Sequence, residues 1–94
     1  MIKFVEIIDD VTAFSKFTLS DVWINEKYVV SIREARDYRT LLREGMLPPD
    51  LSESHVFSTV TTNNGHITAT HVVVGAPSSV AIKLNHDKKT LLKG

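Results

Sequence analysis

The residues best suited to chemistry are the four arginines of the chain, which all fall within the segment 33–43. Guanidinium groups bind phosphates and carboxylates through paired N–H donors, and a neighbouring aromatic ring can stack on a base. If this segment is helical, Arg39 and Arg43 share a face and Arg36 lies one turn earlier. The predicted ligand-binding residues are therefore Arg36, Tyr38, Arg39 and Arg43. They would contact an anionic small ligand, such as a nucleotide, or an acidic surface of a partner protein.

The same arginines also fit a purely structural role. A solvated turn followed by a helix would pair the guanidinium groups with nearby carboxylates, and exposed ion pairs of this kind contribute little stability. The acidic residues within reach are Glu34, Asp37 and Glu44. A binding site and a solvated connector both stay open on the sequence alone.

The stretch TVTTNNGHITATHVVV (59–74) is rich in threonine and predicts a β-hairpin. An Asn-Gly pair between Val-, Thr- and Ile-rich runs favours a two-residue type I′ turn, here Asn64 and Gly65. In that register Thr62 lies opposite Ile67, and side chains alternate between an apolar face and a threonine-rich face. The apolar face holds Val56, Val60, Ile67, Ala69 and Val73, with Ser58, Thr62 and His71 among them.

The histidines of this hairpin do not predict a metal site. His66 and His71 are five positions apart, so on a strand they point to opposite faces. Zinc requires several ligands about 2 Å from one ion, and no cysteine is available to complete a set. We expect His71, opposite Ser58, to be half-buried and hydrogen-bonded. Neither a metal nor another cofactor is expected.

Composition and motifs narrow the functional class. The 94 residues are 43% hydrophobic and 23% charged, as in an ordinary globular chain. Eleven basic residues balance eleven acidic ones, so no net field attracts nucleic acid or an anionic membrane. The glycines are scattered and no Gly-x-Ser-x-Gly elbow occurs, so we do not expect an enzyme.

We expect a cytoplasmic location, because the sequence shows no recognisable targeting signal. The missing cysteines fit a reducing cytosol. The N-terminal stretch MIKFVEIIDD is not typical of a signal peptide, and no apolar run reaches the ~20 residues that cross a bilayer. We expect a single domain, 1–94, in the cytoplasm and without membrane association.

Further strands precede the hairpin. They are predicted over 2–8, 14–25 and 27–34. Asn25 and Glu26, between the last two, suit a tight turn, so these two strands are expected to pair as a hairpin. In the segment KYVVSIRE, Tyr28, Val30 and Ile32 would share one face.

Residues 34–54 interrupt the strand pattern and predict a long loop, which is unusual in a compact domain and suggests a functional segment. Within it, 39–46 could form a helical turn or two that ends at Gly45. Pro48 and Pro49 prevent any helix or central strand from continuing.

The segment 77–92 favours a helix that starts at Pro77. Its buried face would hold Val80, Ala81 and Leu84. Val80, Ile82 and Leu84 also alternate as in a strand, so both assignments stay open. Together the elements predict an α+β, mostly β fold: a small curved antiparallel sheet or a partly open five-stranded barrel, with the long 34–54 loop and a short C-terminal helix.

Two segments carry a resemblance to known proteins. VWINEKYVVSI (22–32) resembles the strand pair of short phage and prophage proteins and of small flagellar proteins of the FlbD type. STVTTNNGHITATHVVVGAPSSV (58–80) is similar to their second hairpin and the short helix after it. In those proteins the second hairpin follows directly, whereas here 34–55 intervenes. The resemblance implies a small, non-enzymatic, phage-encoded β protein and carries over no active residues.

The leading functional hypothesis is a small non-catalytic binding protein that binds or sequesters a host partner or ligand in the host cytoplasm. One alternative is a nucleotide or phosphate-ligand binder that uses the arginine-rich loop. Another is a small RNA-binding barrel, against which the neutral charge argues. Near-zero net charge, together with Phe57, Val72 and Val74 on the second face of the hairpin, predicts self-association as a symmetric dimer.

Overall fold

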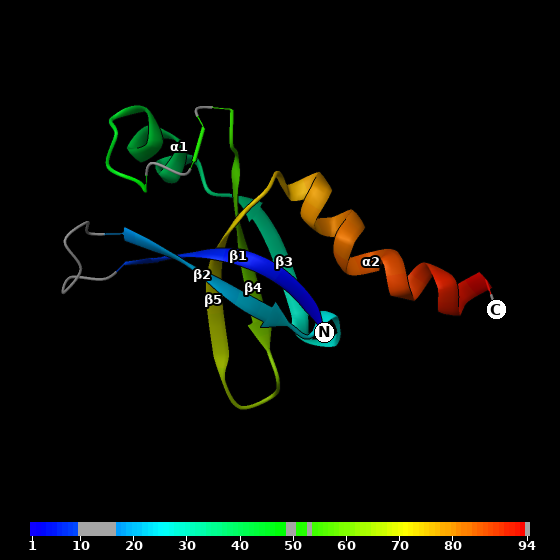
Figure 1. Ribbon diagram of the computed structural model, residues 1–94. Helices are drawn as coiled ribbons and strands as arrows, with labels where there is room; N and C mark the ends of the chain where they lie inside the picture. Colours follow the sequence, from blue (N-terminus) through cyan, green and yellow to red (C-terminus); the bar gives the residue numbers. More distant parts are fainter. Residues whose placement is uncertain (10–16, 49–50, 53, 94) are drawn as a thin grey trace.

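The fold is a mostly β, unclosed five-stranded antiparallel sheet with two α-helices, as the sequence predicts (Figure 1). The computed structural model describes residues 1–9, 17–48, 51–52 and 54–85, and the backbone of 86–93. The strands are β1 (Ile2–Asp9), β2 (Phe17–Ile24), β3 (Val29–Glu34), β4 (Phe57–Asn63) and β5 (Thr68–Val74). The helices are η1 (a 3₁₀ turn, Glu26–Tyr28), α1 (Arg36–Arg43) and α2 (Pro77–Lys93).

The strand order is β2-β1-β5-β4-β3, so β2 and β3 form the two edges of the sheet. The predicted hairpin between them is wrong. Residues 26–28 form a 3₁₀ turn, and the side chain of Asn25 accepts a hydrogen bond from the Lys27 N–H at 3.0 Å. This corner directs β3 away from β2 and onto β4.

A connection this short between opposite edges requires a curved sheet. Neighbouring strands are about 4.8 Å apart, so the edges of a flat five-stranded sheet would lie roughly 19 Å apart. Residues 25–28 include a 3₁₀ turn with a rise of only ~2 Å per residue. The two edges must therefore curl toward one another at this corner, which makes one face of the sheet concave.

The predicted register of the β4–β5 hairpin is also wrong. Thr62 pairs with Ala69 rather than Ile67, which leaves a four-residue loop, 64–67. A type I′ turn requires positive φ at both central residues, but only Gly65 has it, at +95°. The side chain of Asn64 instead accepts hydrogen bonds from two N–H groups of the loop, those of His66 at 3.0 Å and Ile67 at 2.9 Å.

The predicted faces of this hairpin are correct although its predicted register is wrong. Val60 pairs with His71 instead of Ala69, a shift of two residues along β5. Because side chains alternate with a period of two, such a shift leaves every side chain on its original face. Val60, Ser58 and Val73 are all fully buried. Ile67, in the loop, is exposed instead.

One core cluster lies between the sheet and α2. Val80 and Leu84 of the helix are buried, whereas Ile82 is 68% exposed. This spacing confirms a helix over the segment and rejects the strand alternation. The buried members are Phe4, Ile24, Val60, Val73, Val80 and Leu84. Gly75, at φ +138°, turns the chain from β5 toward this helix.

A second core cluster lies on the other face, under α1. Its buried members are Ile7, Phe17, Ala35, Leu42, Leu47 and Phe57. Phe57 is fully buried, and Val72 and Val74 pack against the same cluster. The apolar surface expected to drive dimerisation is thus covered by the chain itself, so that reason for self-association is wrong.

Helix α1 ends where the sequence predicts but begins earlier, at Arg36. Gly45, at φ +72°, donates to the Leu42 carbonyl at 3.1 Å, and the Met46 N–H donates to the Leu41 carbonyl at 3.0 Å. This pair of bonds is a Schellman cap, which favours glycine because of the positive φ.

Strand β3 departs from simple alternation. Its register against β4 shifts between Val29 and Ser31, which marks a β-bulge. Val29 and Ile32 consequently both pack against the α2-side core, while Val30 is 64% exposed. The expectation that Tyr28, Val30 and Ile32 share one face is therefore wrong.

Candidate functional site

Helix α1 places three of the predicted site residues together. Arg36, Arg39 and Arg43 are spaced i, i+3 and i+7, so they fall within roughly 60° of arc at 3.6 residues per turn. All three side chains are exposed. We call this surface the arginine face of α1.

The fourth predicted site residue, Tyr38, lies on the opposite side of the helix. Its ring is 6.0 Å from the ring of Phe17 in an edge-to-face arrangement and 6.4 Å from that of Phe57. Burial raises the pKa of the Tyr38 hydroxyl, with a further contribution from the charges of Asp9 and Asp37. Tyr38 is therefore partly buried against the second core cluster and does not share the exposed face of Arg39 and Arg43.

Among the described residues, one arginine of the face has an acidic partner. Arg36 Nε lies 3.3 Å from Glu34 Oε2, and this contact is largely solvated because the Arg36 side chain is 86% exposed. In the described parts of the chain, Arg39 and Arg43 form no ion pair. Among the described carboxylates, the predicted pairing is thus realised at Glu34, and the exposed side chains of Arg39 and Arg43 form no ion pair with the others.

A pocket beside the start of α1 does not suit an anion. It has a volume of about 310 Å³ and is lined by Glu34, Ala35, Arg36, Asp37, Tyr38 and Thr59. Two carboxylates and one guanidinium give this lining a net negative charge. An anionic group would therefore meet the arginine face rather than this pocket.

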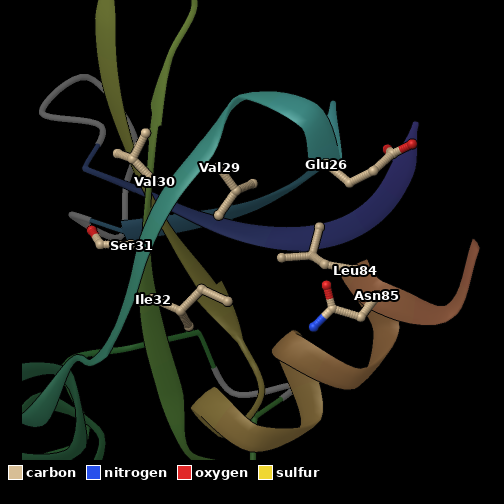
Figure 2. A pocket seen from close by; sticks show the side chains of 7 residues that line it. All are labelled: Glu26, Val29, Val30, Ser31, Ile32, Leu84 and Asn85. Carbon is tan, nitrogen blue, oxygen red and sulfur yellow. The ribbon is translucent and has the colours of Figure 1, made fainter. Parts of the chain in front are cut away.

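A second hollow lies between the edge strand β3 and α2 (Figure 2). It has a volume of about 260 Å³ and is lined by Glu26, Val29, Val30, Ser31, Ile32, Leu84 and Asn85. A hydrogen bond from its own backbone N–H lowers the pKa of the Glu26 carboxyl, so this group stays ionised at neutral pH. The hollow combines aliphatic walls with one carboxylate, the Ser31 hydroxyl and the Asn85 amide, and its lining includes no histidine or lysine that could act as a base.

A third hollow, the aromatic pocket, separates the β2–β3 corner from the β4–β5 hairpin. Its volume is about 140 Å³, and its lining is Trp23, Ile24, Asn25, Tyr28, Thr62, Asn64, Ile67, Ala69 and His71. Trp23 is 57% exposed and Tyr28 is 45% exposed. Exposed aromatic side chains around a hollow are typical of binding surfaces.

A histidine–carboxylate pair adjoins the aromatic pocket. His71 Nδ1 lies 2.6 Å from Glu6 Oε2, and both side chains are largely buried, at 24% and 18% exposure. The expectation of a half-buried, hydrogen-bonded His71 is confirmed, although its partner is not Ser58, whose hydroxyl donates to the Gly75 carbonyl at 2.7 Å. The only sequence signal for this pair was one carboxylate inside the apolar run of β1.

Metal ligands and membrane-spanning helices were sought among the described residues. No group of three or more potential ligands (His, Cys, Asp or Glu) gathers among the described residues. The helices in that part of the chain are too short or too polar to cross a bilayer.

Comparison of the chain with protein-family models, curated proteins and solved structures found no match in any of the three.

Proposed function

We propose that this protein is a small non-catalytic binding protein that contacts an acidic surface of a partner protein through the arginine face of α1. The supporting observation is the shared exposed face of Arg36, Arg39 and Arg43. Exposed guanidinium groups without acidic partners gain charge-assisted hydrogen bonds when a carboxylate surface docks on them. Arginine is also enriched among residues that dominate binding energy.

A protein partner suits this surface better than a nucleotide or RNA. The pocket next to the arginines is acidic, and the Tyr38 ring packs against Phe17 and Phe57, so it is not placed to stack on a base. With no net charge, the chain also lacks the general attraction that supports phosphate-backbone binding.

A non-catalytic role is favoured by the surroundings of the His71–Glu6 pair. Histidine–carboxylate pairs activate nucleophiles in many hydrolases, where the second ring nitrogen bonds a hydroxyl or thiol. In the described part of this chain, no such group hydrogen-bonds to His71 Nε2. The resemblance to short phage proteins supports the further proposal of a phage-encoded protein that acts on a host protein in the host cytoplasm.

Reversing two charges on the arginine face should strongly weaken this binding. We expect Arg39→Glu/Arg43→Glu to weaken binding of a poly-glutamate peptide at least about tenfold, because two attractive pairs become repulsive. Amide NMR titration of the full chain measures the affinity, and the shifts should centre on α1. The fold should persist, since both side chains are exposed.

The matched control is Lys3→Glu/Lys27→Glu, which makes the same change in net charge at two other exposed positions. This variant should bind the peptide as the wild type does. Unchanged binding in folded Arg39→Glu/Arg43→Glu would reject the proposal. Tighter binding of ATP than of the peptide at α1 would replace it with the nucleotide alternative.

Self-association is a further proposal. The remaining reasons for it are the absence of net charge, which leaves little repulsion between copies, and the position of β2 and β3 at the edges of an unclosed sheet. We expect gel filtration with light scattering to give a dimer mass at concentrations on the order of 100 μM. A monomer mass under those conditions would contradict this proposal.

A further inference from the structure

The size of the aromatic pocket limits what it can hold. Ligand pockets that enclose whole small molecules have volumes of roughly 300–1,000 Å³, whereas this pocket has about 140 Å³. One ring fits such a space, and a complete nucleotide does not. The occupant is therefore a single ring presented by a larger molecule.

The charge of the lining distinguishes between the larger molecules that present rings. The lining residues include neither lysine nor arginine. Single-stranded nucleic acid is held by stacking together with cationic groups that follow its phosphates. With no such cation in the lining, a polypeptide is the better match. The lining also includes polar side chains that can form hydrogen bonds with the backbone of such a polypeptide: Asn25, Thr62 and Asn64.

His71 selects which ring is bound. A carboxylate only accepts hydrogen bonds, so in the neutral imidazole the 2.6 Å contact with Glu6 places the ring hydrogen on Nδ1 and leaves Nε2 as an acceptor. Glu6 is not part of the pocket lining, so the bonded edge of the ring faces away from the pocket. No described group hydrogen-bonds to Nε2. A buried tyrosine hydroxyl needs such a partner.

We infer that the aromatic pocket binds one tyrosine side chain of a partner protein, with Trp23 and Tyr28 against the ring and His71 Nε2 accepting from its hydroxyl. This site is separate from the arginine face: α1 lies at one end of the sheet and the tip of the β4–β5 hairpin at the other (Figure 1). Binding at the aromatic pocket can therefore be tested independently of binding at α1.

The test is an NMR titration of the full chain with N-acetyl-L-tyrosinamide. Trp23 is the only tryptophan, so its indole N–H gives a single signal that reports on the pocket. We expect this signal to shift saturably, with a dissociation constant on the order of 1 mM for so small a probe. N-acetyl-L-phenylalaninamide, which lacks the hydroxyl, should bind about fivefold more weakly.

Two variants distinguish the contribution of the aromatic ring to binding from that of the hydroxyl. His71→Phe keeps a ring but removes the acceptor, so the preference for the tyrosine probe over the phenylalanine probe should disappear. Trp23→Ala, at an exposed position that should not disturb folding, should weaken both probes; here the Tyr28 ring and amide signals report binding. Arg39→Glu/Arg43→Glu should bind both probes as the wild type does, which separates a failure here from a failure at α1.

Three results would overturn the inference. The first is no saturable shift of the Trp23 indole signal up to concentrations on the order of 10 mM. The second is equal affinity for the tyrosine and phenylalanine probes in the wild type, since the His71 acceptor would then select nothing. The third is tighter binding of AMP than of the tyrosine probe, which would assign the pocket to a nucleobase.

Discussion

Replacing Val60 by aspartate should unfold the protein. Val60 is fully buried in the centre of β4, among Phe4, Val73 and Leu84. An unpaired charge at such a site costs about 3–5 kcal/mol, and the lower end of the usual stability range, roughly 0.05 kcal/mol per residue, is about 5 kcal/mol for a chain of 94 residues. Circular dichroism and the dispersion of amide NMR signals should both report an unfolded chain at 25 °C.

The neighbouring position provides the control. Thr61 points to the opposite face of the sheet and is partly exposed. Thr61→Asp should therefore lower the free energy of unfolding by less than about 1 kcal/mol. A folded Val60→Asp with a wild-type denaturation midpoint would contradict the described core. Strong destabilisation by Thr61→Asp would show instead that a partner or second copy covers the threonine-rich face.

Truncating Phe57 to alanine should cost about 3–5 kcal/mol, the usual range for a buried phenylalanine. Its ring is fully buried beneath α1, next to Tyr38. Its carbonyl also accepts from the Ala35 N–H at 2.9 Å, at the entrance to α1. The cavity would thus loosen the attachment of α1 to the sheet. Urea denaturation measures the loss, and hydrogen exchange should accelerate first in α1.

Thr59→Ala is the matched comparison on the same strand and the same face. Thr59 is only partly buried, so we expect a loss of less than about 1 kcal/mol. Equal effects of the two substitutions would mean that the second core cluster does not hold α1 in place. The arginine face would then need another structural support.

The sequence predicted the five strands and the faces of the β4–β5 hairpin because these depend on local spacing. Alternation placed Val60 inside and Thr61 partly outside in both the predicted and the observed register, since these differ by two residues and a two-residue shift preserves the faces. Gly45 predicted the end of α1 because a Schellman cap needs positive φ at one position. The shared face of Arg36, Arg39 and Arg43 follows from helical periodicity in the same way.

Tertiary structure decided which elements meet. Asn25 supports a 3₁₀ corner rather than a hairpin turn, so β2 pairs with β1 and β3 pairs with β4. Tyr38 is partly buried because contact of its ring with Phe17 and Phe57 removes apolar surface from water. Local hydrogen bonds such as that of Asn25 compete with strand pairing, and side-chain burial decides between the alternatives. Burial depends on residues that are distant in the chain.

The two candidate sites differ in the same way: one depends on local spacing and the other on tertiary structure. The arginine face lies within one helix and was visible in the sequence, whereas the aromatic pocket assembles from the β2–β3 corner and the β4–β5 hairpin. Glu6 and His71 are 65 positions apart, and no local pattern links them. They meet because β1 pairs with β5, at Glu6 and Val73. Which distant strands pair is set by the packing of the whole sheet, and local periodicity carries no information about it.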